Sequence, residues 1–205
     1  MMKVVTLVRH TTVGAARRGR YIGSSDPPLE DEGLRQARAL ARIVAARKPD
    51  LCWCSPLRRS RQTAEIISTD ANIGILEDED LREIDFGEWE GLTFQEICQR
   101  SPQAATEWTA FSSSFAFPGG ESVTAFFART RRVAKRILAH EAKRPLVVAH
   151  GGSIRVLLCH LLGLPARHYM AFHTPPASIA TVECCGERGE LVELNNCVHD
   201  GNTGD

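Results

Sequence analysis

The sequence predicts an α/β fold, a three-layer sandwich in which helices cover both faces of a mostly parallel central sheet. Short runs of apolar and β-branched residues alternate along the chain with segments whose apolar residues recur at helical spacing. This alternation favours parallel strands that are joined by crossover helices. The 205 residues contain no internal repeat and no linker that would divide them, so we expect a single domain over residues 1–205.

The first half of the chain supplies three of the predicted strands and two of the helices. Short apolar runs predict strands at residues 3–8, 51–54 and 73–76. Asp31 begins a helix, because apolar residues follow it at helical spacing as far as Val44. Ser55 is the expected N-cap of the second helix, with proline directly after it, which places that helix at residues 57–68.

The second half of the chain continues the alternation. Thr93 precedes Glu96 by three residues, a capping-box pattern that predicts the start of a helix. Residues 146–149 are continuously apolar, which predicts a strand that is buried on both faces. The remaining elements are helices at residues 122–142 and 154–162 and a closing hairpin of residues 178–185 and 190–195.

Composition and charge exclude several classes of protein. Lysine plus arginine and aspartate plus glutamate number 25 each, so the formal net charge is zero, and we expect neither a nucleic-acid partner nor a membrane. The apolar run at residues 4–8 is too short for a signal peptide, and nothing approaches the length of a membrane span. The seven cysteines fit no zinc or disulfide spacing, which indicates reduced thiols in a cytoplasmic protein.

Basic residues follow three of the predicted strands. They are Arg9 and His10 after the first strand, Arg58, Arg59 and Arg61 after the second, and His150 after the strand at 146–149. Ligands of open α/β sheets bind outside the carboxyl ends of the strands, so we expect these side chains to form an anion site, with phosphate as the natural ligand of arginine. Adjacent helical residues point about 100° apart, so at most two of the three arginines enter the site, and the pattern alone does not choose among them.

Five blocks of the sequence resemble the motifs of one family and occur in that family's order over most of the chain. They are the Arg-His block at residues 7–11, the arginine-rich block at 55–64, the acidic block at 81–91, the Gly-Gly-Glu block at 118–122 and the His-Gly-Gly block at 148–152. On these motifs the chain is identified as a member of the histidine phosphatase superfamily, also called phosphoglycerate mutase-like. The resemblance implies that family's α/β fold and a phosphatase chemistry that needs no metal and no cofactor.

The resemblance also implies a role for each residue that matches a family motif. His10 attacks phosphorus and becomes a phosphohistidine, which requires a neutral imidazole whose other nitrogen a backbone carbonyl holds. Glu83 protonates the leaving oxygen and then activates water, because a carboxyl group next to a phosphate anion is favoured in its protonated form. The match to the second block selects one arginine there, and the phosphoryl oxygens are bound by Arg9, Arg59, His150 and the backbone N–H of Gly151.

The first motif departs from the common form of the family. Thr11 and Thr12 stand where many members have Gly and Glu, and Ala16 stands in the place of an Asn that contacts phosphate. The following loop, residues 19–29, resembles that of α-ribazole-5′-phosphate phosphatases, which act late in cobalamin nucleotide-loop assembly. We therefore expect a phosphatase of cobalamin synthesis.

The same loop carries further candidate binding residues. We expect the N–H groups of Ile22, Gly23 and Ser24 to face the phosphate, because glycine allows a close approach of the backbone to a ligand. Tyr21 either stacks on the substrate or packs within an ordered surface turn, and the sequence leaves both readings open.

Two enzymatic alternatives and one non-enzymatic alternative also stay open. A phosphoglycerate mutase would trap the phosphoryl group with an insertion between Gly91 and Pro118, which is short here, so hydrolysis is favoured. A sugar-bisphosphate phosphatase also fits the motifs. A phosphate-binding protein with a decayed site would have lost at least one of five central residues, but all are present: Arg9, His10, Arg59, Glu83 and His150. We expect a small phosphorylated substrate and leave a homodimer open.

Overall fold

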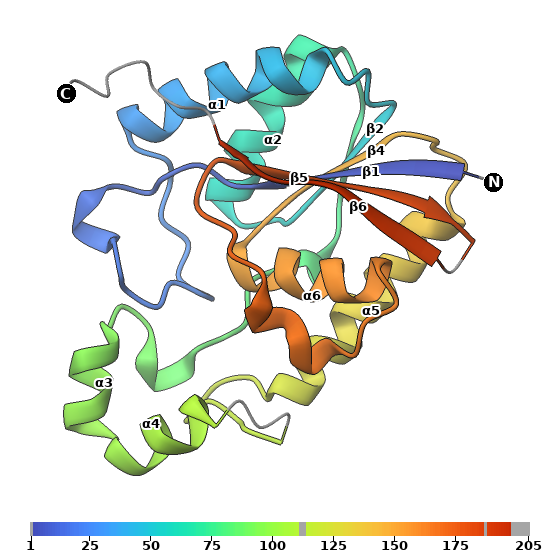
Figure 1. Ribbon diagram of the computed structural model, residues 1–205. Helices are drawn as coiled ribbons and strands as arrows, with labels where there is room; N and C mark the ends of the chain where they lie inside the picture. Colours follow the sequence, from blue (N-terminus) through green and yellow to red (C-terminus); the bar gives the residue numbers. More distant parts are fainter. Residues whose placement is uncertain (1, 111–113, 187, 198–205) are drawn as a thin grey trace, which may run out of the picture.

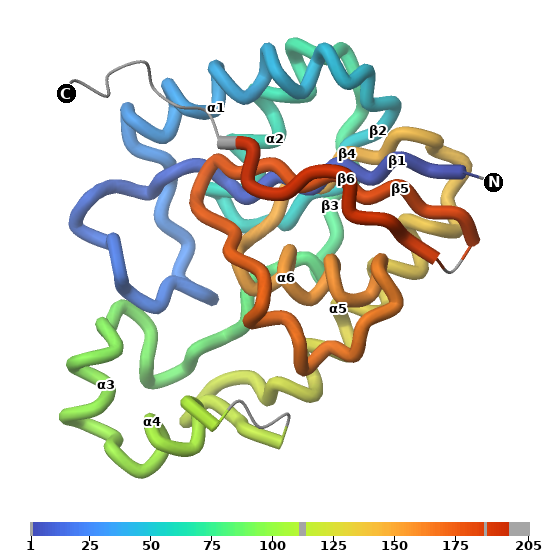
Figure 2. The backbone as a smooth tube through the Cα atoms, in the orientation of Figure 1, coloured from blue at the N-terminus to red at the C-terminus, as the bar shows by residue number. Residues whose placement is uncertain are grey.

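The computed structural model describes residues 2–110, 114–186 and 188–197 of the chain. The strands within these residues are β1 (Met2–Arg9), β2 (Leu51–Cys54), β3 (Ile75–Glu77), β4 (Pro145–Ala149), β5 (Ser178–Cys185) and β6 (Arg188–Cys197). They form one sheet in the order β3-β2-β4-β1-β5-β6 (Figures 1 and 2). The first four strands of that order are parallel, and β5 and β6 pair antiparallel to their neighbours, so the predicted mostly parallel sheet is confirmed.

Helices cover both faces of the sheet. Figure 1 shows α1 (Asp31–Ala45) and α2 (Arg58–Ala71) on one face and α5 (Val123–Ala139) and α6 (Gly151–Leu161) on the other. The short helices α3 (Phe94–Arg100) and α4 (Pro102–Thr109) lie farther from the sheet. Short 3-10 segments complete the order: η1 (Ala15–Arg17), η2 (Glu79–Leu81), η3 (Gly87–Trp89) and η4 (Ala166–Ala171). No helix in the described part of the chain is long and apolar enough to cross a membrane.

β4 is continuously apolar because both of its faces are covered, and all five of its residues are buried. Val147 and Ala149 belong to the apolar cluster under α5 and α6, whereas Leu146 and Val148 belong to the cluster under α1 and α2. The parallel pairing of β1 with β4 then brings the ends of both strands to the same edge of the sheet. His150, the residue after β4, therefore emerges beside the end of β1.

Two predicted helix starts have different outcomes. Thr93 caps α3 as expected: its hydroxyl accepts from the N–H of Glu96 at 3.2 Å, and the Glu96 carboxylate accepts from the N–H of Thr93 at 2.7 Å. The prediction that Ser55 caps the second helix is wrong, because α2 begins only at Arg58. The Ser55 hydroxyl instead contacts Nε2 of His150 at 2.7 Å, which ties the end of β2 to the end of β4.

Candidate active site

His10 follows β1 directly and is only 6% exposed. Its Nδ1 lies 2.7 Å from the carbonyl oxygen of Thr11, and since that oxygen can only accept, Nδ1 carries the proton. Its Nε2 accepts a hydrogen bond from Nε of Arg59 at 3.3 Å. Burial, with the charges of Arg59 and Arg9, holds the pKa of His10 well below its ordinary value. The imidazole is therefore neutral, and its unprotonated Nε2 directs its lone pair toward Nε of Arg59.

His150 lies next to His10, with the two ring centroids 5.1 Å apart. Its Nδ1 is buried and has no hydrogen-bond partner among the described residues. Burial, with the nearby charge of Arg59, lowers the pKa of His150 well below its ordinary value. An unpaired buried nitrogen among basic side chains is a group that a bound anion would satisfy.

Arg9 is the last residue of β1 and directly precedes His10. Its Nη1 donates to the carbonyl oxygen of Thr174 at 2.6 Å, whereas its Nε is buried without a partner among the described residues. Burial lowers the pKa of Arg9 to about 10, although the charge of Glu83 opposes that effect. A Cβ on Gly151 would lie 3.1 Å from Cζ of Arg9, so the glycine lets the guanidinium lie against the first turn of α6.

Arg59, in the first turn of α2, is fully buried. Besides His10, its guanidinium binds three backbone oxygens of the loop after β1, the carbonyls of Ile22, Gly23 and Ser25. Burial lowers the pKa of Arg59, and the carboxylate charges of Glu83, Asp26 and Glu90 act in the opposite direction. The side chain therefore stays a cation inside the protein without a direct carboxylate partner in the described ion pairs.

Glu83 reaches the same place from the irregular segment between η2 and η3. Its carboxylate accepts from the N–H of Gly152 at 2.8 Å and from the N–H of Ile84 at 3.1 Å. A Cβ on Gly152 would lie 2.4 Å from Oε1 of Glu83, so only glycine lets the carboxylate reach the N-terminus of α6. Sequence reasoning gives Gly152 no role of its own; the doubled glycine after His150 is the only signal for it.

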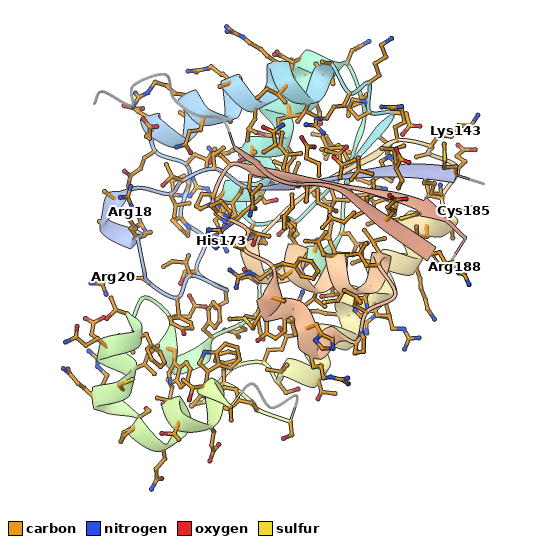
Figure 3. All side chains as sticks on the ribbon, viewed as in Figure 1. Arg18, Arg20, Lys143, His173, Cys185 and Arg188 are labelled. Atoms are coloured by element: carbon orange, nitrogen blue, oxygen red, sulfur yellow. The ribbon has the colours of Figure 1, made fainter. Side chains whose placement is uncertain are left out.

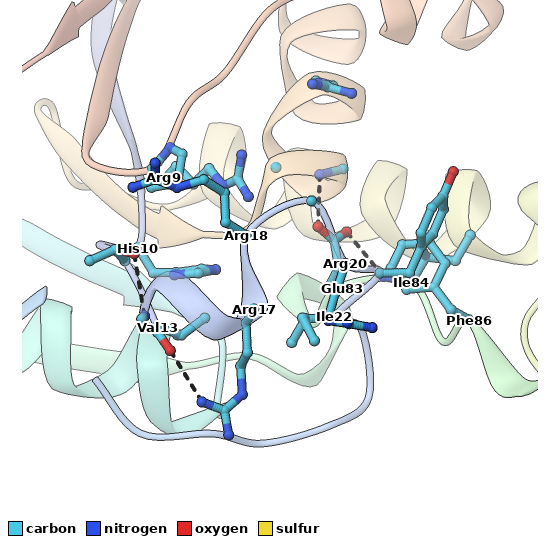
Figure 4. A pocket seen from close by; sticks show the side chains of 18 of the residues that line it. Arg9, His10, Val13, Arg17, Arg18, Arg20, Ile22, Glu83, Ile84 and Phe86 are labelled. Carbon is cyan, nitrogen blue, oxygen red and sulfur yellow. Dashed lines mark hydrogen bonds between the residues drawn. The ribbon is translucent and has the colours of Figure 1, made fainter. Parts of the chain in front are cut away.

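A cavity of about 1080 Å³ adjoins these groups, and Figure 4 shows Arg9, His10 and Glu83 at its wall. The loop after β1 borders it, and Figure 3 shows Arg18 and Arg20 on that loop. Its lining includes the predicted site residues Arg9, His10, Tyr21, Ile22, Glu83 and Gly151. Arg59 and His150 do not line the cavity but are buried beside His10. No group of three metal-binding side chains occurs in the described ranges.

Residues 5–197 match the histidine phosphatase superfamily (branch 1). The chain belongs to this superfamily. It is 29% identical to phosphoserine phosphatase 1 of Hydrogenobacter thermophilus over 202 residues. The matched region covers 98% of this chain and 95% of the relative. Its fold is similar to that of the α-ribazole phosphatase from Shigella flexneri, with a TM-score of 0.85 at 26% identity over 94% of this chain and 96% of the other. It is also similar to mycobacterial glucosyl-3-phosphoglycerate phosphatase, with a TM-score of 0.85 at 30% identity over 94% and 98% of the two chains.

The loop after β1 is turned differently in this histidine phosphatase from what its sequence predicts. The N–H groups of Gly23 and Ser24 donate to the carboxylate of Glu90, at 3.0 and 2.8 Å, so the prediction that they face the phosphate is wrong. The physical reason is that Arg59 binds the carbonyl edge of the loop, including the carbonyl of Ile22, and the N–H edge must then face the opposite way.

Tyr21 packs against the aromatic residues beyond the loop. Its ring lies edge-on to Phe86, with centroids 4.9 Å apart, and its hydroxyl accepts from Nε1 of Trp108 at 3.2 Å. Since Tyr21 also belongs to the lining of the cavity, the packed ring remains part of the wall that a substrate would meet.

Arg129 of α5 holds the segment that carries Glu83, and sequence reasoning missed it. Its guanidinium donates to the carbonyl oxygens of Asp80, Arg82 and Glu83 at 2.9, 2.6 and 2.9 Å. It also pairs with the carboxylate of Glu121 at 2.7 Å, and both side chains of that pair are less than one-fifth exposed. No local pattern marks this contact, because the carbonyl groups that Arg129 binds lie more than forty residues away in the chain.

We expect Arg129→Gln to lower the free energy of unfolding by about 3 kcal/mol, because a largely buried carboxylate and three carbonyl oxygens lose their partner. Urea denaturation measures this change. The matched control is Arg132→Gln on the same helix, whose side chain is 59% exposed and whose pair with Asp80 contributes less than about 1 kcal/mol. Equal losses in the two variants would contradict an anchoring role of Arg129.

Proposed function

We propose that this chain hydrolyses phosphomonoesters in the cytoplasm through a phosphohistidine intermediate on His10. The observation that supports the proposal most directly is that Nε2 of His10 is unprotonated and accepts a hydrogen bond from Nε of Arg59. His10 lies next to His150 and lines a cavity that Arg9 and Glu83 also line. A neutral nucleophile among cations suits phosphoryl transfer, whose transition state carries its negative charge on the phosphoryl oxygens.

The proposed reaction has two steps. In the first step, Nε2 of His10 forms a bond to phosphorus while the bond from phosphorus to the ester oxygen breaks, and the carboxyl group of Glu83 gives its proton to that oxygen. In the second step, the Glu83 carboxylate takes a proton from water, the water oxygen bonds to phosphorus, and the bond to Nε2 breaks. Phosphate, the free imidazole and the protonated Glu83 result.

The phosphoryl oxygens are bound in this scheme by Arg9, Arg59, His150 and the N–H of Gly151. A phosphoryl group takes the place of the hydrogen bond between Arg59 and His10, and it supplies acceptors for Nε of Arg9 and Nδ1 of His150. The charge of the phosphoryl group also favours the protonated form of His150, which burial among cations disfavours in the substrate-free protein.

As the substrate we propose α-ribazole 5′-phosphate, with a role in cobalamin synthesis. The motif of residues 19–29 and the similarity to the Shigella α-ribazole phosphatase support it. The cavity is much larger than a phosphoryl group, and Ile84, Phe86 and Tyr169 in its lining offer apolar surface to a flat ring. Relatives named for phosphoserine and glucosyl-3-phosphoglycerate support a phosphorylated carboxylic acid as the second candidate.

A substrate panel assayed with and without EDTA tests this proposal. We expect the highest kcat/KM for α-ribazole 5′-phosphate, by about tenfold over phosphoserine, 3-phosphoglycerate and fructose 2,6-bisphosphate, with rates that the chelator leaves unchanged. Loss of activity that magnesium restores would contradict the metal-free scheme. Conversion of 3-phosphoglycerate to its isomer, without release of phosphate, would favour the mutase alternative.

A further inference from the structure

We propose that Glu90 is a positioning residue of the phosphoryl site and acts on Arg59 through the peptide groups of residues 22–25. The proposal rests on the proposed function in one respect, that Arg59 binds the phosphoryl group. Glu90 follows η3, is partly buried, and does not line the cavity. Its action on the site must therefore pass through other groups.

The carboxylate of Glu90 binds the N–H edge of the loop. Oε1 accepts from the N–H groups of Gly23 and Ser24 at 3.0 and 2.8 Å, and Oε2 accepts from the N–H of Ser25 at 3.3 Å and from its hydroxyl. The N–H of Phe86 approaches the same carboxylate at 3.3 Å. Successive N–H groups that converge on one point form an anion-binding nest, and hydrogen bonds to an ionised acceptor are stronger than neutral ones.

Arg59 binds the opposite edge of the same peptides. The carbonyl oxygens of Gly23 and Ser25 accept from its guanidinium at 2.9 and 2.6 Å, and that of Ile22 accepts at 3.3 Å. The peptides that precede Gly23 and Ser24 therefore each have a carboxylate at the N–H end and a guanidinium at the C=O end. Charges of opposite sign at the two ends of a peptide dipole polarise it and strengthen both hydrogen bonds.

The loop is also fixed sterically against the segment that carries Glu83. A Cβ on Gly23 would lie 2.0 Å from the carbonyl oxygen of Ile84 and 2.6 Å from Oε1 of Glu90, so only glycine fits there. The same loop therefore contacts the neighbour of Glu83 on one side and Arg59 on the other. A small displacement of the Glu90 carboxylate would therefore shift both Arg59 and the segment that carries Glu83.

This arrangement suits a phosphate-binding arginine better than a direct ion pair does. A carboxylate bonded to Arg59 itself would compete with the phosphoryl group for the guanidinium. The peptide groups of the loop instead separate the negative charge of Glu90 from Arg59. The Nε of Arg59, which donates to His10 in this structure, can therefore donate to a phosphoryl oxygen when substrate binds. The negative charge of Glu90 also opposes the lowering of the Arg59 pKa by burial, which keeps the cation in place.

Glu90→Gln tests the proposal, because the amide keeps the shape but loses the charge and turns one acceptor into a donor that faces N–H groups. We expect calorimetric binding of inorganic phosphate and kcat/KM for p-nitrophenyl phosphate each to fall about 10- to 100-fold. An alkyl phosphate should lose as much, since Arg59 contacts the phosphoryl group and not the leaving group. The control Glu88→Gln removes an exposed carboxylate two residues away and should change both quantities less than about twofold.

A double-mutant cycle with Arg59→Lys separates positioning from a merely structural role. If Glu90 acts through Arg59, adding Glu90→Gln to Arg59→Lys should cost less than about threefold in phosphate binding, whereas independent effects would multiply. Multiplying effects would overturn the proposal, and so would a loss of thermal stability without a loss of phosphate affinity.

Ser25→Ala provides a milder variant that decides the matter if Glu90→Gln does not fold. It removes only the hydroxyl bond to Glu90 and should weaken phosphate binding about threefold, and an unchanged affinity would overturn the proposal. Phosphate binding requires no turnover. A wild-type protein that binds phosphate but hydrolyses no phosphomonoester would therefore contradict the proposed function. The phosphate affinities of the Glu90 and Ser25 variants would still decide whether Glu90 positions Arg59.

Discussion

His10→Ala should retain less than about 10⁻⁴ of the wild-type kcat/KM for p-nitrophenyl phosphate, because the variant lacks the only nucleophile of the scheme. His150 cannot take its place, because its Nε2 contacts the Ser55 hydroxyl and its Nδ1 binds a phosphoryl oxygen in the proposed scheme. Steady-state kinetics measure the loss. Acid-sensitive incorporation of labelled phosphate, trapped by rapid quenching, should disappear in the same variant.

The fold should survive this substitution, so the loss can be assigned to chemistry. The main cores lie above and below the sheet and do not include His10, and its removal also relieves the burial of an imidazole beside two arginines. His168→Ala, at an exposed histidine, is the matched control and should keep full activity. Turnover above about 1% of the wild-type rate in a folded His10→Ala protein would contradict the assignment of His10 as the nucleophile.

The residues that the sequence could place are those at strand ends. Arg9 ends β1, His10 follows it, and His150 follows β4. The burial of both strands on two faces made their carboxyl ends predictable from apolar runs alone. The choice among three arginines was not predictable in this way. It depends on where α2 begins, and Ser55 and Pro56 point to a start that the structure does not have. In the structure Arg59 is buried, whereas Arg61 pairs with Glu65 and Glu77 at the surface.

Contacts between irregular segments could not be predicted from patterns in the sequence. Glu83 stands among many carboxylates, and only the resemblance to a family block singled it out. The bonds from Glu90 to Gly23 and Ser24 join loops that are 67 and 66 residues apart, without any periodic signal in either. α4 was missed for a related reason: Ala105 is its only buried residue among those described, so its sequence shows no apolar stripe.

Glu83→Gln should lower kcat/KM more for a leaving group that needs a proton than for one that leaves without it. For an alkyl phosphate we expect kcat/KM to fall about 10²- to 10⁴-fold, since an alkoxide leaves poorly without a general acid. For p-nitrophenyl phosphate the fall should be less than about tenfold, because p-nitrophenolate leaves without protonation. The comparison must use kcat/KM, which reports the steps up to phosphoryl transfer, because kcat also contains the hydrolysis of the phosphohistidine that Glu83 assists.

The structure makes this variant informative because glutamine can keep the position of Glu83. Its amide oxygen can still accept from the N–H of Gly152, so the segment that Arg129 holds should not move. The control Glu79→Gln neutralises a nearby carboxylate whose side chain is 75% exposed, and it should leave both substrates unaffected. Equal slowing of both leaving groups in Glu83→Gln would instead assign Glu83 to the support of α6, because a structural defect does not distinguish between oxygens that need a proton and oxygens that do not.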